Sequence, residues 1–128
     1  MTDGCNQKCS FCLNDFQSKP SNGKMKFLDS SVAKKVIWQY ADSFKGKYPL
    51  QVYFSGGEPT LHPHLTEIME YAKSLDCRVT LNTNGNFPDS LESAFWLFSD
   101  QIHFGTYGKS KKHAEKFHFQ AHIWKCSI

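Results

Sequence analysis

The sequence of 128 residues predicts one α/β domain built around a parallel sheet. Two observations carry this prediction: the alternation of two kinds of segment along the chain, and the length of the chain. Segments with apolar residues at helical spacing alternate along the chain with short runs of β-branched and aromatic residues. Alternation of this kind is typical of parallel strands joined by right-handed helical crossovers. The length allows one hydrophobic core but not two, and no linker divides residues 1–128.

The elements are expected in a regular order after an extended loop over residues 5–23, which closes with turn-forming residues. The expected helices cover about residues 30–44, 64–75, 89–98 and 110–119. The expected strands cover about residues 50–55, 78–84, 101–107 and 121–128. Asp29 or Ser30 is expected to cap the first helix. The predicted apolar face of that helix consists of Val32, Val36, Ile37, Tyr40 and Phe44.

The composition argues against several classes of protein. Hydrophobic residues make up 40% of the chain and charged residues 21%, which favours a folded domain over a disordered one. The net charge of +3 is small and the lysines are scattered, which argues against a nucleic-acid partner. No apolar run approaches the roughly 18 residues of a membrane helix. Because the N-terminus has no secretory pattern either, we expect a cytoplasmic protein with no membrane partner.

Three of the five cysteines crowd one short segment, with the spacing C-x3-C-x2-C at Cys5, Cys9 and Cys12. In a chain without an export signal, this crowding favours metal or redox use over a disulfide framework. Thiolates suit zinc, copper(I) and iron–sulfur centres. A structural zinc site needs four ligands, so three thiols match a cubane cluster with one open iron better. Three incidental buried cysteines are the disfavoured alternative, and Cys77 and Cys126 are expected to be small buried side chains.

Glycine-rich and polar residues follow the expected strands. The turn Gly56-Gly57-Glu58-Pro59 would allow close backbone approach to a ligand. Glu58 could be a ligand or simply a carboxylate at a helix N-terminus. Asn84-Gly85 could bind a ligand or be an ordinary turn. Ligands bind at the carboxyl ends of parallel strands, so a site is expected at this edge of the sheet.

The histidines show no tidy metal-binding spacing. His103 lies within an expected strand, where a core or surface position is favoured over contact with a substrate. His62 and His64 flank a proline before a helix and are expected to be exposed to solvent.

These motifs together resemble those of the radical S-adenosylmethionine (radical SAM) superfamily. Cys5, Cys9 and Cys12, with the aromatic Phe11 just before the third cysteine, are similar to the signature of that family. The turn at residues 56–59 resembles its GGE motif, one crossover later. Residues 83–85 and 103–108 resemble the endings of its third and fourth strands. The resemblance spans nearly the whole chain.

The resemblance implies a partial TIM-like (βα)n barrel of parallel strands, with about four to five βα units present. It also implies that the radical SAM core domain is truncated at both ends. Cys5, Cys9 and Cys12 would ligate a [4Fe–4S] cluster, whose fourth iron would be chelated by SAM. The other cofactor-binding residues that it implies are Phe11 beside the adenine, Gly56, Gly57 and Glu58 at the SAM amino group, and Asn84 and Thr106 as further contacts.

The implied reaction is reductive cleavage of SAM to a 5′-deoxyadenosyl radical, which abstracts hydrogen from an unknown small-molecule or peptide substrate. The implied partners are an electron donor such as flavodoxin or ferredoxin and, where the barrel is incomplete, a partner chain that completes it. Two alternatives stay open. One is a non-catalytic iron–sulfur or SAM-binding fragment or module completed by a partner subunit. The other, weaker one is a structural zinc loop.

Overall fold

The computed structural model describes residues 1–7, 9, 12 and 24–105 and the backbone of 121–124. The elements are α1 (Ser30–Phe44), β1 (Gln51–Phe54), the short 3-10 helix η2 (Pro59–Leu61), α2 (Leu65–Ser74), β2 (Arg78–Thr83), α3 (Asp89–Phe98), β3 (Gln101–Gly105) and β4 (Ala121–Trp124). The predicted order of helices and strands is confirmed over these residues. The predicted helix at 110–119 and the strand residues 106–107 and 125–128 lie outside the described residues.

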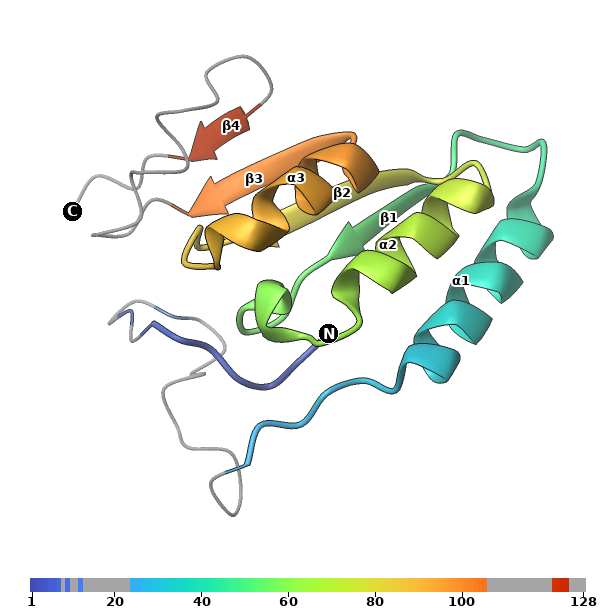
Figure 1. The fold of residues 1–128 in the computed structure, drawn as a ribbon. Helices are drawn as coiled ribbons and strands as arrows, with labels where there is room; N and C mark the ends of the chain where they lie inside the picture. The colour runs from blue at the N-terminus through green and yellow to red at the C-terminus, as the bar shows by residue number, and fades with distance from the viewer. Residues whose placement is uncertain (8, 10–11, 13–23, 106–120, 125–128) are drawn as a thin grey trace.

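The four described strands form one parallel sheet in the order β1-β2-β3-β4. Each strand therefore pairs with its neighbour in sequence, and each crossover from β1 to β3 passes through one α-helix. Because such crossovers share one hand, the helices fall on the same face of the sheet, as Figure 1 shows. All the strands end at one edge, which is where a parallel α/β fold places its site.

The core lies between α2, α3 and the sheet. Its fully buried side chains come mainly from β2, β3 and the inner face of α2, where hydrophobic spacing and strand alternation both point inward. The largest of them are Phe54, Phe95, Phe104, Leu65, Ile68, Met69, Leu81 and Ile102. None of the described helices is long and apolar enough to cross a membrane.

The predicted apolar face of α1 was partly wrong. The buried residues are Ala33, Ile37 and Ala41, whereas Val32 and Val36 are 47% and 57% exposed. The reason is that α1 packs mainly against α2, and not over the centre of the sheet. Ala33 and Ala41 are small and allow α1 to approach α2 closely. The buried face of α1 therefore includes two alanines, which the hydrophobic pattern alone did not pick out.

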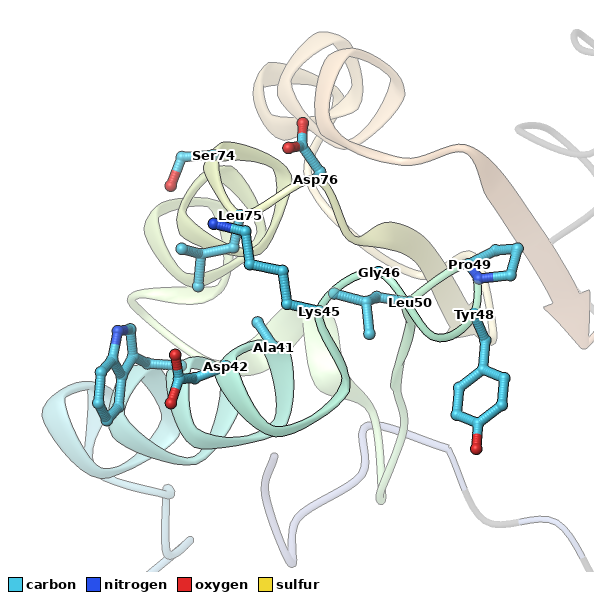
Figure 2. Close-up of a pocket in the computed structure, with 11 residues that line it drawn as sticks. Ala41, Asp42, Lys45, Gly46, Tyr48, Pro49, Leu50, Ser74, Leu75 and Asp76 are labelled. Atoms are coloured by element: carbon cyan, nitrogen blue, oxygen red, sulfur yellow. The ribbon is translucent and has the colours of Figure 1, made fainter.

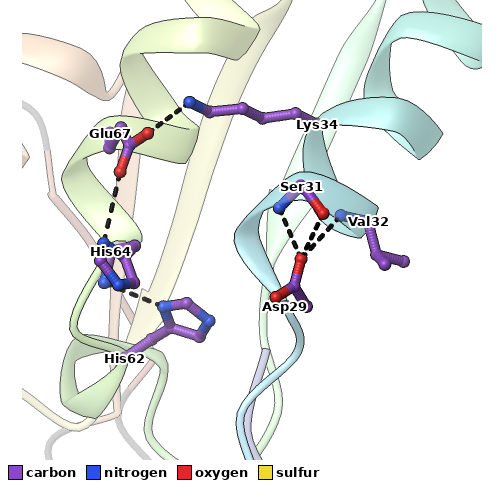
Figure 3. Close-up of polar contacts among 7 residues, drawn as sticks. All are labelled: Asp29, Ser31, Val32, Lys34, His62, His64 and Glu67. Carbon is purple, nitrogen blue, oxygen red and sulfur yellow. Dashed lines mark hydrogen bonds and ion pairs between the residues drawn. The ribbon is translucent and has the colours of Figure 1, made fainter.

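The start of α1 has the predicted cap. The Asp29 carboxylate accepts hydrogen bonds from the backbone N–H groups of Ser31 and Val32, at 2.9 and 3.3 Å (Figure 3). These bonds satisfy two of the N–H groups that a helix leaves without partners in its first turn.

The prediction that both His62 and His64 are exposed was wrong for His62. The His62 side chain is only 4% exposed. Its Nδ1 accepts a hydrogen bond from the His64 N–H at 3.1 Å, so Nε2 carries the proton and donates to the Leu28 carbonyl at 2.7 Å. Figure 3 shows His64 beside Glu67, which also pairs with Lys34 of α1. His62 thus joins the segment before α1 to η2.

Candidate functional site

The segment that leads into the cysteines is hydrogen-bonded to the carboxyl end of β1. The Met1 amino group donates to the Ser55 carbonyl at 3.0 Å. The Gly57 N–H donates to Thr2 O at 3.1 Å, and the Glu58 N–H donates to Gly4 O at 2.8 Å. In Figure 1 this N-terminal segment runs past the ends of the strands. These hydrogen bonds therefore place Cys5 at the edge of the sheet where a site is expected.

Glycine is required at both positions of the turn because the N-terminal segment lies against its backbone. A Cβ atom on Gly57 would lie 1.9 Å from Gly4 O, and one on Gly56 would lie 2.8 Å from Thr2 O. Gly56 also has a φ of +145°, which side-chain-bearing residues rarely adopt. The sequence predicted that this turn would approach a ligand closely; among the described residues, the segment that approaches it is the N-terminus of the chain itself.

Glu58 joins the end of β1 to the end of β2. Its side chain is fully buried, and its Oε1 accepts from the Thr60 N–H at 3.1 Å, the Thr60 hydroxyl at 2.6 Å and the Thr83 hydroxyl at 2.7 Å. Its Oε2 accepts from the Asn84 N–H at 2.7 Å. Four donors of this kind compensate the loss of water around a buried carboxylate. Glu58 thus has the helix-capping role that the sequence left open, at η2.

The three cysteines of the loop are half-buried and form no disulfide. Partial burial, followed by the proximity of Cys5 and Cys12, raises the pKa of Cys9. The Cys5 sulfur accepts from the Gln7 N–H at 3.4 Å and from Asn84 Nδ2 at 3.7 Å. Two N–H donors, one from the loop itself and one from the turn after β2, are therefore directed at one of its sulfurs.

The donor chemistry of this loop suits an iron–sulfur cluster. Within the described residues, no three His, Cys, Asp or Glu side chains are close enough together to hold one metal ion. Thiolates that bind different irons of a cubane do not need to meet at one point. Three soft thiol ligands on one half-exposed loop therefore suit an iron–sulfur cluster.

Asn84 connects the cysteine loop to the turn after β2. Its Nδ2 also donates to Asn6 Oδ1 at 2.8 Å, and its Oδ1 accepts from the Asn86 N–H at 2.8 Å. Asn6 Nδ2 donates in turn to the Asn86 carbonyl at 2.7 Å. The sequence pointed to Asn84 but missed the contacts of Asn6, Thr60 and Thr83. Asn6 meets Asn84 and Thr83 meets Glu58 across long distances in the sequence, whereas Thr60 contacts Glu58 only two residues away.

The structure describes only some of the other residues that the sequence singled out. Phe11, Thr106 and Cys126 are outside the described residues. Cys77 is 1% exposed, as predicted for a small buried side chain, and burial raises the pKa of its thiol. His103 is half-buried on β3.

A cavity of about 380 Å³ lies at the opposite edge of the sheet (Figure 2). It is bounded by the C-terminal end of α1, the loop before β1 and the C-terminal end of α2, with Trp38, Tyr48 and Leu75 among its lining residues. These segments precede the strands, so the cavity is separate from the cysteine loop. Parallel α/β folds bind ligands at the other edge.

Comparison with known proteins places these observations in a family. The model of the radical SAM superfamily matches residues 1–105. A GTP 3′,8-cyclase of Actinobacillus pleuropneumoniae serotype 3 (strain JL03) is 37% identical over 87 residues, which are 66% of this chain and 24% of that protein. A GTP 3′,8-cyclase of Vibrio vulnificus (strain YJ016) is 34% identical over 87 residues, which are 66% of this chain and 25% of that protein.

The aligned segment thus spans about a quarter of the length of these curated relatives. The family match, by contrast, covers most of the chain, including the cysteine motif, the turn at residues 56–59 and Asn84. The resemblance seen in the sequence is confirmed. The chain belongs to the radical SAM superfamily, a family of enzymes that use a [4Fe–4S] cluster and S-adenosylmethionine.

Proposed function

We propose that this chain is a radical SAM enzyme domain whose cluster is held by Cys5, Cys9 and Cys12. When bound, the cluster and SAM supply the difficult chemistry, which is one-electron cleavage of SAM to a 5′-deoxyadenosyl radical that abstracts hydrogen from a substrate. The observation that carries the proposal is that the backbone N–H groups of Gly57 and Glu58 donate hydrogen bonds to the carbonyls of Thr2 and Gly4 in the N-terminal segment. This bonding holds the cysteine loop beside the carboxyl ends of the strands.

The residues of this chain would bind and orient the cofactors. The amino group of SAM is a cation, and backbone carbonyls at Gly56 and Gly57 are suitable acceptors for it. Glu58 would hold the Gly56-Gly57 turn in place, because its carboxylate is fully buried and already accepts four hydrogen bonds. Phe11 beside the adenine and Thr106 at the end of β3 complete the proposed cofactor contacts.

We propose further that the sheet is part of a TIM-like barrel, supported by its parallel strands in sequential order. An electron donor of the flavodoxin or ferredoxin class would reduce the cluster in the cytoplasm, and a partner chain could complete the barrel. The alternatives are a module that binds cluster and SAM without catalysis and, more weakly, a structural zinc loop.

One experiment separates these functions. The chain is reconstituted anaerobically with iron and sulfide, reduced with dithionite in the presence of SAM, and assayed for 5′-deoxyadenosine by chromatography. The enzyme would form 5′-deoxyadenosine, and Cys9→Ala would abolish it while Cys77→Ala, in the core, would not. Cluster absorbance without 5′-deoxyadenosine would favour the non-catalytic module. Stoichiometric zinc without cluster uptake would favour the zinc loop.

The relatives supply a candidate substrate, GTP, from their printed names. If this chain acts on GTP, ribose-deuterated GTP should transfer deuterium into 5′-deoxyadenosine. Formation of 5′-deoxyadenosine with no deuterium would exclude GTP as the substrate that loses hydrogen, but it would still demonstrate radical SAM activity.

A further inference from the structure

Asn84 is oriented so that its amide nitrogen, and not its oxygen, faces the Cys5 sulfur. The Asn86 N–H can only donate, so the atom of Asn84 that it contacts at 2.8 Å must be the oxygen. The other end of the same side chain is then Nδ2, which lies 3.7 Å from Cys5 Sγ. The orientation follows from the backbone and requires no choice of amide flip.

Asn6 fixes the same orientation independently. Its Nδ2 lies 2.7 Å from the Asn86 carbonyl, which can only accept, so its Oδ1 faces Asn84. That oxygen accepts the second Nδ2–H of Asn84 at 2.8 Å. Both N–H groups of Asn84 therefore have acceptors, and one of them is the sulfur of Cys5.

The backbone of Asn84 is held as well. Its N–H donates to the buried Glu58 carboxylate at 2.7 Å. The Cys5 sulfur also receives the Gln7 N–H at 3.4 Å. A sulfur ligand with two N–H donors is stabilised most when it carries the most negative charge.

From this geometry we propose that Asn84 is a positioning and tuning residue whose amide N–H···S hydrogen bond to Cys5 raises the reduction potential of the cluster. The inference rests on the proposed function, in which Cys5 is a cluster ligand. Reduction adds one electron to the cluster and its thiolates, and a hydrogen-bond donor at sulfur stabilises that added charge. Asn84 would thereby make the reduced cluster, which SAM cleavage needs, more accessible. Both N–H groups of Asn84 are used in this arrangement, so the direct contact with SAM expected of this residue would fall to its Oδ1.

The test is an anaerobic redox titration of the reconstituted protein, followed by electron paramagnetic resonance (EPR). Asn84→Ala should reduce the equilibrium constant for cluster reduction about tenfold, which is a midpoint potential about 59 mV lower for a one-electron couple. Asn84→Asp should lower the midpoint potential at least as much, because the N–H donor that faces the Cys5 sulfur is replaced by an acceptor oxygen. Asn86→Ala is the matched control in the same turn, since only the backbone of Asn86 takes part in the network.

The potential distinguishes tuning from simple support of the fold. A potential in Asn84→Ala or Asn84→Asp equal to that of Asn86→Ala would overturn the inference while leaving the proposed function intact. Asn84→Asp keeps the oxygen that accepts the Asn86 N–H, so it reports the potential if Asn84→Ala disrupts the turn. Loss of the cluster from both Asn84 variants, with Asn86→Ala intact, would also overturn it, because a residue that tunes potential is not required for assembly. Absence of a cluster from the wild type would instead refute the proposed function.

Discussion

Glu58 shows how one buried residue can fix the geometry of a site made from separate strands. Its carboxylate accepts from Thr60, Thr83 and the Asn84 N–H, so it couples the turn after β1 to the turn after β2. The cost of burying this charge is offset only while all the donors face oxygen.

Glu58→Gln should therefore destabilise the fold although it barely changes the shape of the side chain. The amide nitrogen would have to face either the Thr83 hydroxyl or the Asn84 N–H, both of which now donate. We expect a loss of about 3 kcal/mol in the free energy of unfolding, measured by urea denaturation. Glu70→Gln, on the exposed side of α2, should change it by about 0.5 kcal/mol or less. Equal effects of the two substitutions would contradict this role for Glu58.

Gly57 tests the contact between the turn and the N-terminal segment. Gly57→Ala would place a methyl carbon 1.9 Å from the Gly4 carbonyl oxygen, and neither atom can move without its backbone. We expect cluster incorporation to fall sharply, measured as iron and sulfide per chain after reconstitution. Gly46→Ala is the control, because no atom lies within 4 Å of its added Cβ and only its positive φ of 73° is strained. Normal cluster incorporation in Gly57→Ala would show that the N-terminal segment need not dock there.

At the scale of elements, α1 shows where hydrophobic periodicity misleads. The sequence offered Val32, Val36 and Ile37 as one face, but the helix buries Ala33, Ile37 and Ala41 against α2. Ile37→Ala should lower the free energy of unfolding by about 2–4 kcal/mol. Val36→Ala, one residue away and 57% exposed, should change it by about 0.5 kcal/mol or less. The reverse ranking in urea denaturation would mean that the predicted face was right after all.

The turn from α3 to β3 is held to its neighbours by Asp100. Its carboxylate accepts from the Val79 N–H at 2.7 Å and from the Lys73 ammonium at 2.8 Å. Burial alone would raise the pKa of Asp100, but the Lys73 and Val79 hydrogen bonds outweigh it and lower that pKa.

A lowered pKa in the folded state makes this contribution depend on pH. The stabilisation is fully present above the unfolded-state pKa of about 3.9 and is lost as the pH falls through the lower folded-state pKa. The stability difference between wild type and Asp100→Asn should thus shrink on going from about pH 6 to about pH 3. Urea denaturation at both pH values measures it, and a constant difference would show that Asp100 does not titrate in this way.

At the scale of the whole molecule, the order and type of the elements could be predicted because helix and strand periodicities are local properties of a sequence. The same holds for the Asp29 cap, whose partners are two and three residues away. The burial of His62 and the docking of Thr2 and Gly4 against Gly56 and Gly57 could not be predicted. They depend on contacts between residues far apart in the chain, for which one sequence carries no signal.

We propose one site for a cluster and SAM, formed by the cysteine loop and the ends of β1 and β2. The most direct test is the EPR spectrum of the reconstituted, reduced chain, recorded with and without SAM. We expect the signal of a reduced [4Fe–4S] cluster that changes when SAM is added and is absent from Cys9→Ala. A cluster signal that SAM leaves unchanged, or one that persists in Cys9→Ala, would contradict it.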